Sequence, residues 1–275
     1  MKVWSILEFF PEKSRISVLD IGAALSERPP YQTLVESGRA RIFGFEPNQP
    51  ECERLNSVYG PPHRFFPYFV GDGQPAVFHE TNWALTGSLY EPNSRLLQKF
   101  QNLAELTTQV ATHPVGTTRI DDIPEIDDVD FIKIDIQGNE LCVFQNALGA
   151  LSNALLIQTE VELVELYKKQ PLFADVDIFL RSKGFQFHTF TGFGTRAFKP
   201  VVVNGDVNLG LRQMLWSDAI YVRDWMQLER LSIAKLQNYA ILAHEVLQSY
   251  DLAHLVLLAL DQRSGGKLAA LTYSA

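Results

Sequence analysis

Candidate ligand-binding residues stand at the ends of four short apolar runs in the sequence. These runs are residues 16–21, 40–45, 65–70 and 130–134. Gly22 follows the first run, Glu46 the second and Asp135 the fourth, while Asp72 stands in the Gly-Asp-Gly turn after the third. A glycine lets backbone approach a ligand closely, and carboxylates accept hydrogen bonds from hydroxyl and amino groups. These residue types suit a ligand that contains a ribose and an adenine.

Glu46 has the spacing of a ribose-binding acid. It stands about two dozen residues beyond the turn at Gly22, where a carboxylate can accept hydrogen bonds from both hydroxyls of a ribose. An exposed acid beside a helix start at Asn48 is the structural alternative. Asp20, just before Gly22, is a further candidate for a cofactor site. Asp72 could accept a bond from an adenine amino group, and a plain Asp-Gly turn explains it nearly as well.

The fourth apolar run gives the strongest block, with the sequence D-F-I-K-I-D-I-Q-G-N-E over residues 130–140. It delivers an acid, Asp135, an amide, Gln137, and a glycine onto a helix start, and so places Asp135 at the floor of a cleft. A helix-capping role for Asp135 is the alternative. Cys52 and Cys142 are too few for a disulfide framework and lack a zinc-binding pattern, so we expect them to be buried apolar residues.

Strands and helices are expected to alternate around these positions. Apolar runs without polar interruption are typical of strands buried on both faces. We predict further strands at 154–161, 185–190 and 219–222, and helices at 49–58, 139–147 and 173–183. This order favours a doubly wound, mostly parallel sheet in an α/β domain over residues 1–223.

Two segments break the alternation. Residues 72–119 contain a short strand at 76–79, a polar loop at 82–93, a helix at 94–106 and a strand near Val115, which fits an insertion over the ligand edge or a pair of edge strands. Residues 224–275 are expected to form a helical hairpin that turns near 249–251. An amphipathic hairpin usually buries its apolar face, so it would serve as a cap or as the surface of a homo-oligomer.

Composition limits the classes of partner. The 275 residues carry a net charge of -8, which opposes nucleic-acid binding through phosphate neutralisation. The longest strongly apolar run, residues 252–260, is too short for a membrane span, and the first residues lack the features of a signal peptide. We therefore expect a cytoplasmic protein that acts on a small-molecule or glycan partner.

Taken together, the motifs resemble those of the FkbM-type family of S-adenosylmethionine-dependent methyltransferases. The resemblance spans roughly residues 18–223 and rests on V-L-D-I-G-A, G-F-E-P, S-L-Y-E-P, T-R-I-D-D, F-I-K-I-D-I-Q-G and W-S-D-A-I. It implies a Rossmann-like class I fold, S-adenosylmethionine as the methyl donor, and methyl transfer to oxygen of a glycan or other small hydroxylated metabolite. It also implies cofactor contacts from the Asp20, Gly22, Glu46, Asp72, Asp135 and Gln137 positions.

One loop departs from the family pattern. Members commonly read D-I-G-A-N followed by a second glycine, whereas this chain has Ala24, Leu25 and Ser26 and then Arg-Pro-Pro-Tyr at 28–31. Without that glycine the loop approaches a ligand less freely. A catalytically weak or inactive binding and assembly module is therefore the first alternative. A nicotinamide-dependent oxidoreductase is the second, and the absence of G-x-G-x-x-G after Ile21 disfavours it.

Methyl transfer to an alcohol needs a base or a metal that acidifies the hydroxyl. The candidates at strand ends are Asp135, then Glu160, then His188, with Glu162 on the same strand face as Glu160. An Asp/Glu/His set would suit Mg²⁺, although magnesium sites have no tight sequence spacing. Trp83 or Tyr90 could stack on a sugar acceptor, and packing is the more common use of such aromatics.

Overall fold

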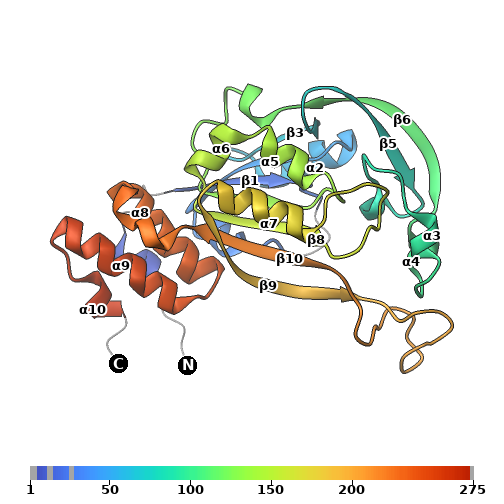
Figure 1. Cartoon of the computed structure of the whole chain (residues 1–275). Helices are drawn as coiled ribbons and strands as arrows, with labels where there is room; N and C mark the ends of the chain where they lie inside the picture. The colour runs from blue at the N-terminus through green and yellow to red at the C-terminus, as the bar shows by residue number, and fades with distance from the viewer. Residues whose placement is uncertain (1–4, 11–14, 25–27, 273–275) are drawn as a thin grey trace.

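A computed structural model describes residues 5–10, 15–24 and 28–272. Its main sheet has the strand order β3-β2-β1-β7-β8-β10-β9 (Figure 1). The strands are β1 (Ile16–Ile21), β2 (Ala40–Phe45), β3 (Arg64–Phe66), β7 (Phe131–Ile134), β8 (Leu156–Glu162), β9 (Phe185–Thr195) and β10 (Met214–Arg223). β3, β2, β1, β7 and β8 pair in parallel, and β10 runs antiparallel to both of its neighbours. The predicted doubly wound, mostly parallel sheet is confirmed.

Helices cover both faces of this sheet. One face packs against α5 (Glu140–Gln145), α6 (Leu148–Asn153) and α7 (Phe173–Ser182), and the other against α1 (Gln32–Glu36) and α2 (Gln49–Tyr59). Helix α2 begins where the Asn48 side chain accepts a bond from Glu51 N and ends at Gly60, whose φ of 59° suits glycine. The prediction of that helix and both of its ends is confirmed.

The strand predicted over residues 65–70 is wrong as a single element. Residues Arg64–Phe66 form β3 of the main sheet, while Phe69–Val70 form β4 of a second sheet with the order β4-β6-β5. Pro67 stands between them, and proline has no N–H to donate to a ladder, so the strand is interrupted there.

The second sheet settles the two alternatives for the insertion. β5 (Pro75–Thr81) pairs antiparallel with β6 (Gln109–Thr118), and β6 pairs in parallel with β4. The chain between β5 and β6 holds a 3-10 turn, η2 (Ala84–Thr86), and two short helices, α3 (Ser94–Leu97) and α4 (Leu103–Leu106). The single helix predicted over 94–106 is wrong, because Asn102 adopts a left-handed conformation that divides it. Paired strands and an insertion are therefore both present.

The C-terminal segment packs on the sheet face that carries Ile16 and Val18. It contains η4 (Trp225–Arg230), α8 (Ile233–Ile241), a π-helical turn η5 (Leu242–Val246), α9 (Tyr250–Ser264) and α10 (Leu268–Thr272). Leu236 and Val256 share one buried cluster with the sheet residues, and Figure 1 shows α8, α9 and α10 grouped at one end of the molecule. The division at residues 223 and 224, and an oligomer through these helices, stay predictions.

Three smaller elements complete the description. They are η1 (Ile6–Phe9), η3 (Ile120–Asp122) and the 196–213 connection, which extends away from the sheet between β9 and β10 in Figure 1. Both cysteines are free, with Cys52 buried and Cys142 partly exposed. Across the residues placed by the structure, no helix is both long and apolar enough to cross a bilayer.

Candidate functional site

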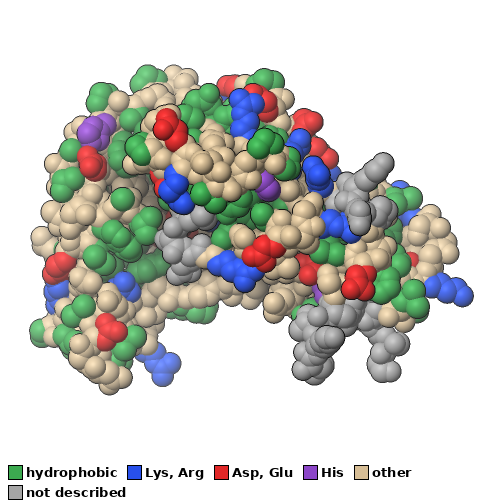
Figure 2. All heavy atoms as spheres, turned by 180° about the vertical axis from the view of Figure 1, so that it is seen from behind, with side chains coloured by type: hydrophobic (Ala, Val, Ile, Leu, Met, Phe, Trp, Pro, Cys, Tyr) green, Lys and Arg blue, Asp and Glu red, His purple; other side chains and the backbone are tan. Residues whose placement is uncertain are grey.

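A cleft of about 1540 Å³ opens at the carboxyl ends of β1, β2, β7 and β8. The second sheet and the ends of β9 and β10 form its other walls, and Figure 2 shows the hollow on this face of the molecule. In open α/β sheets, ligands bind beyond the carboxyl ends of the strands. Five predicted residues line the cleft, namely Gly22, Glu46, Asp135, Gln137 and Glu160.

Gly22 brings the end of β1 against the end of β7. Its φ is 81°, and a Cβ atom at this position would lie 2.1 Å from the carbonyl oxygen of Asp135. No other residue type fits such an approach without moving the backbone. Gly22 therefore fixes the position of Asp135 relative to the first turn. Leu25 and Ser26, on which the departure from the family pattern was predicted, lie outside the described residues.

Glu46 is buried at the edge of the cleft. Its Oε1 accepts a bond of 2.8 Å from Asn48 N, and the backbone of Ala24 also hydrogen-bonds to it. Burial raises the pKa of the Glu46 carboxyl, and these backbone bonds oppose the rise. The side chain is thus held by the two loops that follow β1 and β2, in the place where a ribose contact is expected.

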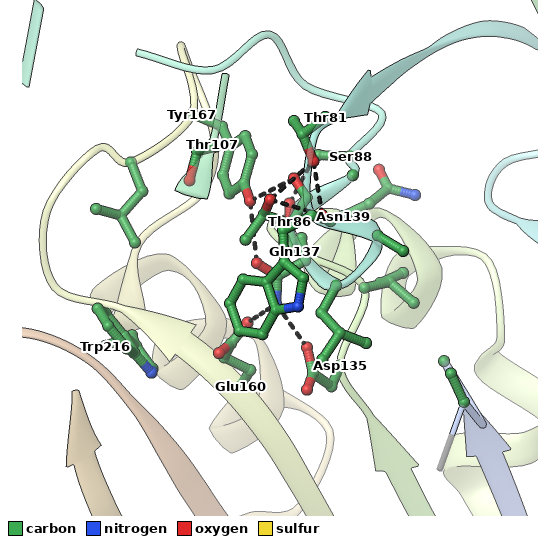
Figure 3. A pocket seen from close by; sticks show the side chains of 18 of the residues that line it. Thr81, Thr86, Ser88, Thr107, Asp135, Gln137, Asn139, Glu160, Tyr167 and Trp216 are labelled. Atoms are coloured by element: carbon green, nitrogen blue, oxygen red, sulfur yellow. Dashed lines mark hydrogen bonds between the residues drawn. The ribbon is translucent and has the colours of Figure 1, made fainter. Parts of the chain in front are cut away.

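Asp135 and Glu160 form a carboxyl pair that is joined by Gln137. Gln137 Nε2 donates to Asp135 Oδ1 at 2.9 Å and to Glu160 Oε2 at 2.7 Å (Figure 3). Burial, followed by the negative charge of Asp135, raises the pKa of Glu160 well above its ordinary value. Within the pair, burial and the neighbouring charge therefore favour the protonated form of Glu160.

Two further carboxyl groups lie behind this pair. Glu140 is buried, and its Oε1 accepts bonds from Ile136 N at 2.9 Å and Gly138 N at 3.2 Å. Burial, together with the charge of Asp135, raises the pKa of Glu140 to about 7. Burial, followed by the charge of Glu140, raises the pKa of Glu162 well above its ordinary value. The sequence analysis missed Glu140, although its place in the first turn of a helix after the Asp135 block could have indicated it.

The raised pKa of Glu140 predicts a pH-dependent contribution to stability. The folded chain binds this proton more tightly than the unfolded chain does, so the contribution is complete below about pH 4.5 and is lost as the pH rises through about 7. Gln in place of Glu140 keeps an oxygen acceptor and does not titrate. We therefore expect the Tm of Glu140→Gln, relative to wild type, to be higher at pH 8 than at pH 5.

Scanning calorimetry at several pH values would measure this difference. Glu53→Gln is the matched control, because Glu53 is an exposed acid on α2 and is absent from the cleft lining. The control should give a difference in Tm that is small at every pH. A difference for Glu140→Gln that stays constant from pH 5 to pH 8 would show that Glu140 titrates normally in the folded chain.

Lys133 lies under the floor of the cleft and was missed by the sequence analysis. Its Nζ donates to Gly22 O at 2.9 Å and lies 3.2 Å from Asp20 Oδ1. Burial lowers the pKa of Lys133, but the charges of Asp20, Asp135 and Asp218 outweigh it and the net direction is upward. A period of two along β7 places Lys133 and Asp135 on one sheet face, and this was the available signal.

Two predicted cofactor-binding residues, Asp20 and Asp72, do not line the cleft. Asp20 is buried beside Lys133 and accepts a short hydrogen bond from Tyr31 Oη. Asp72 is exposed, and its Oδ1 accepts bonds from Gln74 N at 3.0 Å and Thr117 Oγ1 at 3.3 Å, as expected of a turn residue. Direct cofactor contacts from these two residues gain no support. Trp83 lines the cleft, whereas Tyr90 does not.

His188 lies too early on β9 to meet the carboxyl pair. Asp218 of β10 pairs with Glu160 on one side and with Thr191 on the other, so Thr191 and not His188 stands at that level. His188 interacts instead with Asp251 of α9, and burial lowers its pKa. The expectation that His188 joins Asp135 and Glu160 is therefore wrong, and the catalytic roles of the other two stay predictions.

The expected Mg²⁺ site finds no matching ligand set. Gln137 already occupies the oxygens that Asp135 and Glu160 turn toward each other, and His188 lies elsewhere. In the part of the chain that the structure describes, no group of three or more His, Cys, Asp or Glu residues could hold a metal ion. These residues do not fit the predicted hard-cation site.

Comparison with known proteins gives one family match. The family model described as the methyltransferase FkbM domain matches residues 20–187, and no curated protein sequence matches. The solved structure of a SAM-dependent methyltransferase from Aquifex aeolicus is 12% identical in sequence and superposes with a TM-score of 0.29. The match covers 78% of this chain and 87% of the Aquifex chain. The structure of a 30S ribosomal A1408 methyltransferase from an uncultured bacterium is 10% identical with a TM-score of 0.30. That match covers 77% of this chain and 90% of the bacterial one. Likenesses this low carry no argument.

Proposed function

The chain belongs to the FkbM methyltransferase family, and from that premise we propose that it transfers the methyl group of S-adenosylmethionine to a hydroxyl of a glycan or other small hydroxylated metabolite. The observation that carries this proposal is the carboxyl pair of Asp135 and Glu160 in the cleft, joined through Gln137. A carboxylate at that place can take the proton that an alcohol must lose when it is methylated.

The charge of the cleft supports a cationic methyl donor. Among the described residues, the acids that line it are Glu46, Glu51, Glu80, Asp135, Glu160 and Asp218, and the basic residues are Lys133 and Arg196. S-adenosylmethionine carries a net positive charge, whereas the product S-adenosylhomocysteine carries none. A negative potential in a cleft favours a cation. Glu46 would hold the ribose hydroxyls and the turn at Gly22 would let the backbone approach the cofactor, in the same cleft as the carboxyl pair.

In the proposed reaction the acceptor oxygen attacks the methyl carbon of the bound sulfonium. The new O–C bond forms as the C–S bond breaks, and the electron pair of that bond goes to sulfur. The hydroxyl proton goes to Asp135, while Gln137 keeps both carboxyl groups in place. Holding acceptor and methyl group at attack distance can contribute about 7 to 11 kcal/mol in well-oriented systems.

Thermal shift with S-adenosylmethionine, S-adenosylhomocysteine and NAD separates this proposal from its alternatives. A ligand that binds the folded chain raises its Tm by mass action. We expect both adenosyl compounds to raise the Tm, and NAD at the same concentration to leave it unchanged. A shift with NAD alone would favour an oxidoreductase. No shift with any of the three would favour a binding or assembly module without methyltransferase activity.

A further inference from the structure

Exposed apolar side chains gather on two walls of the cleft. Trp83 and Leu85 come from the segment around η2, and Phe193 and Leu209 come from the end of β9 and the connection that follows it. Trp83 is 45% exposed and Phe193 is 53% exposed. Figure 2 shows apolar side chains gathered along the hollow. Clustered exposure of large apolar groups in a concave surface marks a binding site.

The first wall is fastened to the carboxyl pair. Thr81 Oγ1 donates to Trp83 O at 2.8 Å, and Thr86 N donates to the same oxygen at 2.9 Å. Tyr167 Oη lies 2.9 Å from Thr86 O and 3.0 Å from Gln137 Oε1. Figure 3 shows this chain of bonds running from the threonines through Tyr167 to Gln137. The backbone that carries Trp83 is therefore fixed relative to the amide that holds the acids.

The second wall is built around Trp216. A Cβ atom on Gly194 would lie 1.9 Å from the indole ring, so the backbone of Gly194 packs directly on it. The guanidinium of Arg196 lies 5.3 Å from the ring centroid, a distance at which a cation and an indole attract each other. In the view of Figure 3, Glu160 lies between Trp216 and Asp135. Trp216 and the carboxyl pair line the same cleft.

The two cations among the described lining residues are outnumbered by the acids of the lining, and only Lys133 is paired with an acid. Lys133 pairs with Asp20, and Arg196 Nη1 donates to the carbonyl oxygens of Thr195 at 2.8 Å and Asn208 at 3.1 Å. An anionic acceptor would therefore meet an acid-rich lining. The volume of about 1540 Å³ also exceeds the ~300–1,000 Å³ of common small-molecule pockets, which leaves room for a large acceptor beside a nucleoside cofactor.

We propose that the acceptor is an uncharged amphiphile, whose hydroxyl meets Asp135 and whose apolar body lies between the wall of Trp83 and Leu85 and the wall of Phe193, Leu209 and Trp216. This inference rests on the proposed methyl transfer and narrows its acceptor. A hydroxylated head attached to an aliphatic or aromatic body meets both requirements. A purely polar sugar would leave the two apolar walls exposed to water. A phosphorylated metabolite would bring a negative charge close to the acidic residues of the cleft.

Displacement of a neutral fluorophore, N-phenyl-1-naphthylamine, tests the inference on the full chain. Octyl β-D-glucopyranoside below its micelle concentration should displace the fluorophore, whereas methyl β-D-glucopyranoside and octyl phosphate should each need about tenfold higher concentration or more. Trp83→Ser and Phe193→Ser should each weaken fluorophore binding about tenfold, because each removes a large apolar contact. Ile178→Ser is the matched control, since Ile178 is 70% exposed on α7 and absent from the cleft lining.

The affinity for S-adenosylmethionine is measured on the same samples by calorimetry and should be the same in all three variants and wild type. Wild type that binds the methyl donor but not the fluorophore would overturn the inference and leave the proposed function standing. If octyl phosphate and octyl glucoside displaced the fluorophore at equal concentrations, the inference that the acceptor is uncharged would be overturned. If wild type failed to bind the methyl donor while the fluorophore results were as expected, the result would count against the proposed function. The inference of an apolar acceptor site would still stand.

Discussion

Asp135→Asn is expected to lower kcat for methyl transfer by about 10²–10⁴-fold, the usual contribution of a positioned general base, with little change in affinity for S-adenosylmethionine. Asparagine keeps the shape of the side chain and an oxygen that can accept from Gln137, but it cannot take a proton. The partner acid is a poor replacement, because burial still raises the pKa of Glu160 when the charge of Asp135 is removed. Single-turnover measurements with saturating cofactor would report the chemical step.

Glu160→Gln is the matched control for that result. Glutamine resembles the protonated form of Glu160, so we expect a loss of activity at least tenfold smaller than that of Asp135→Asn. Scanning calorimetry on both variants would check that the fold is kept. Equal losses in the two variants would show that Asp135 and Glu160 exchange roles. A larger loss in Glu160→Gln would identify Glu160 as the base.

Glu46→Ala is expected to weaken the binding of S-adenosylmethionine by about 10- to 150-fold. The range corresponds to the net loss of one charge-assisted hydrogen bond to a ribose hydroxyl, worth about 1.5–3 kcal/mol, with a tenfold change in affinity for every ~1.4 kcal/mol. Part of the effect comes from the Asn48 N–H, which loses its acceptor in the variant. Isothermal titration calorimetry of wild type and variant measures the difference directly.

Two variants separate the ribose contact from the local structure. Glu46→Gln keeps an oxygen that can accept from Asn48 N, so its loss of affinity reports mainly the missing charge and should be intermediate. Glu53→Ala removes an exposed acid of α2 that does not line the cleft, and should bind the cofactor as wild type does. Unchanged affinity in Glu46→Ala would remove Glu46 from the site.

The sequence predicted the centre of the sheet more closely than its periphery. The bounds of β1 and β2 agree with the prediction residue for residue, because parallel strands covered on both faces appear as uninterrupted apolar runs. The insertion lacks such a pattern. Residues 109–118 of β6 are mostly exposed, so apolar and polar residues do not alternate along this strand. For that reason only a short strand near Val115 could be predicted.

The sequence predicts which strands end in an acidic residue. It does not predict how far along the strand a side chain lies, or which side chains of other segments contact it. Glu46, Asp135 and Glu160 were placed at the cleft because each follows or ends a strand that the apolar pattern defines. β9 is five residues longer than the predicted 185–190, which left His188 in its first half. Tyr167 was missed because it belongs to the irregular connection between β8 and α7, where no periodicity indicates which side chains point inward.

The most direct test of the central claim is a measurement of methyl transfer itself. Purified chain would be incubated with S-adenosylmethionine carrying an isotopically labelled methyl group and with extract of the source cells, and mass spectrometry would follow both products. We predict that S-adenosylhomocysteine and a metabolite bearing the labelled methyl group on oxygen accumulate together with wild type, and that Asp135→Asn suppresses both. A cofactor that binds but yields neither product with any extract fraction, or equal yields from wild type and Asp135→Asn, would contradict the account.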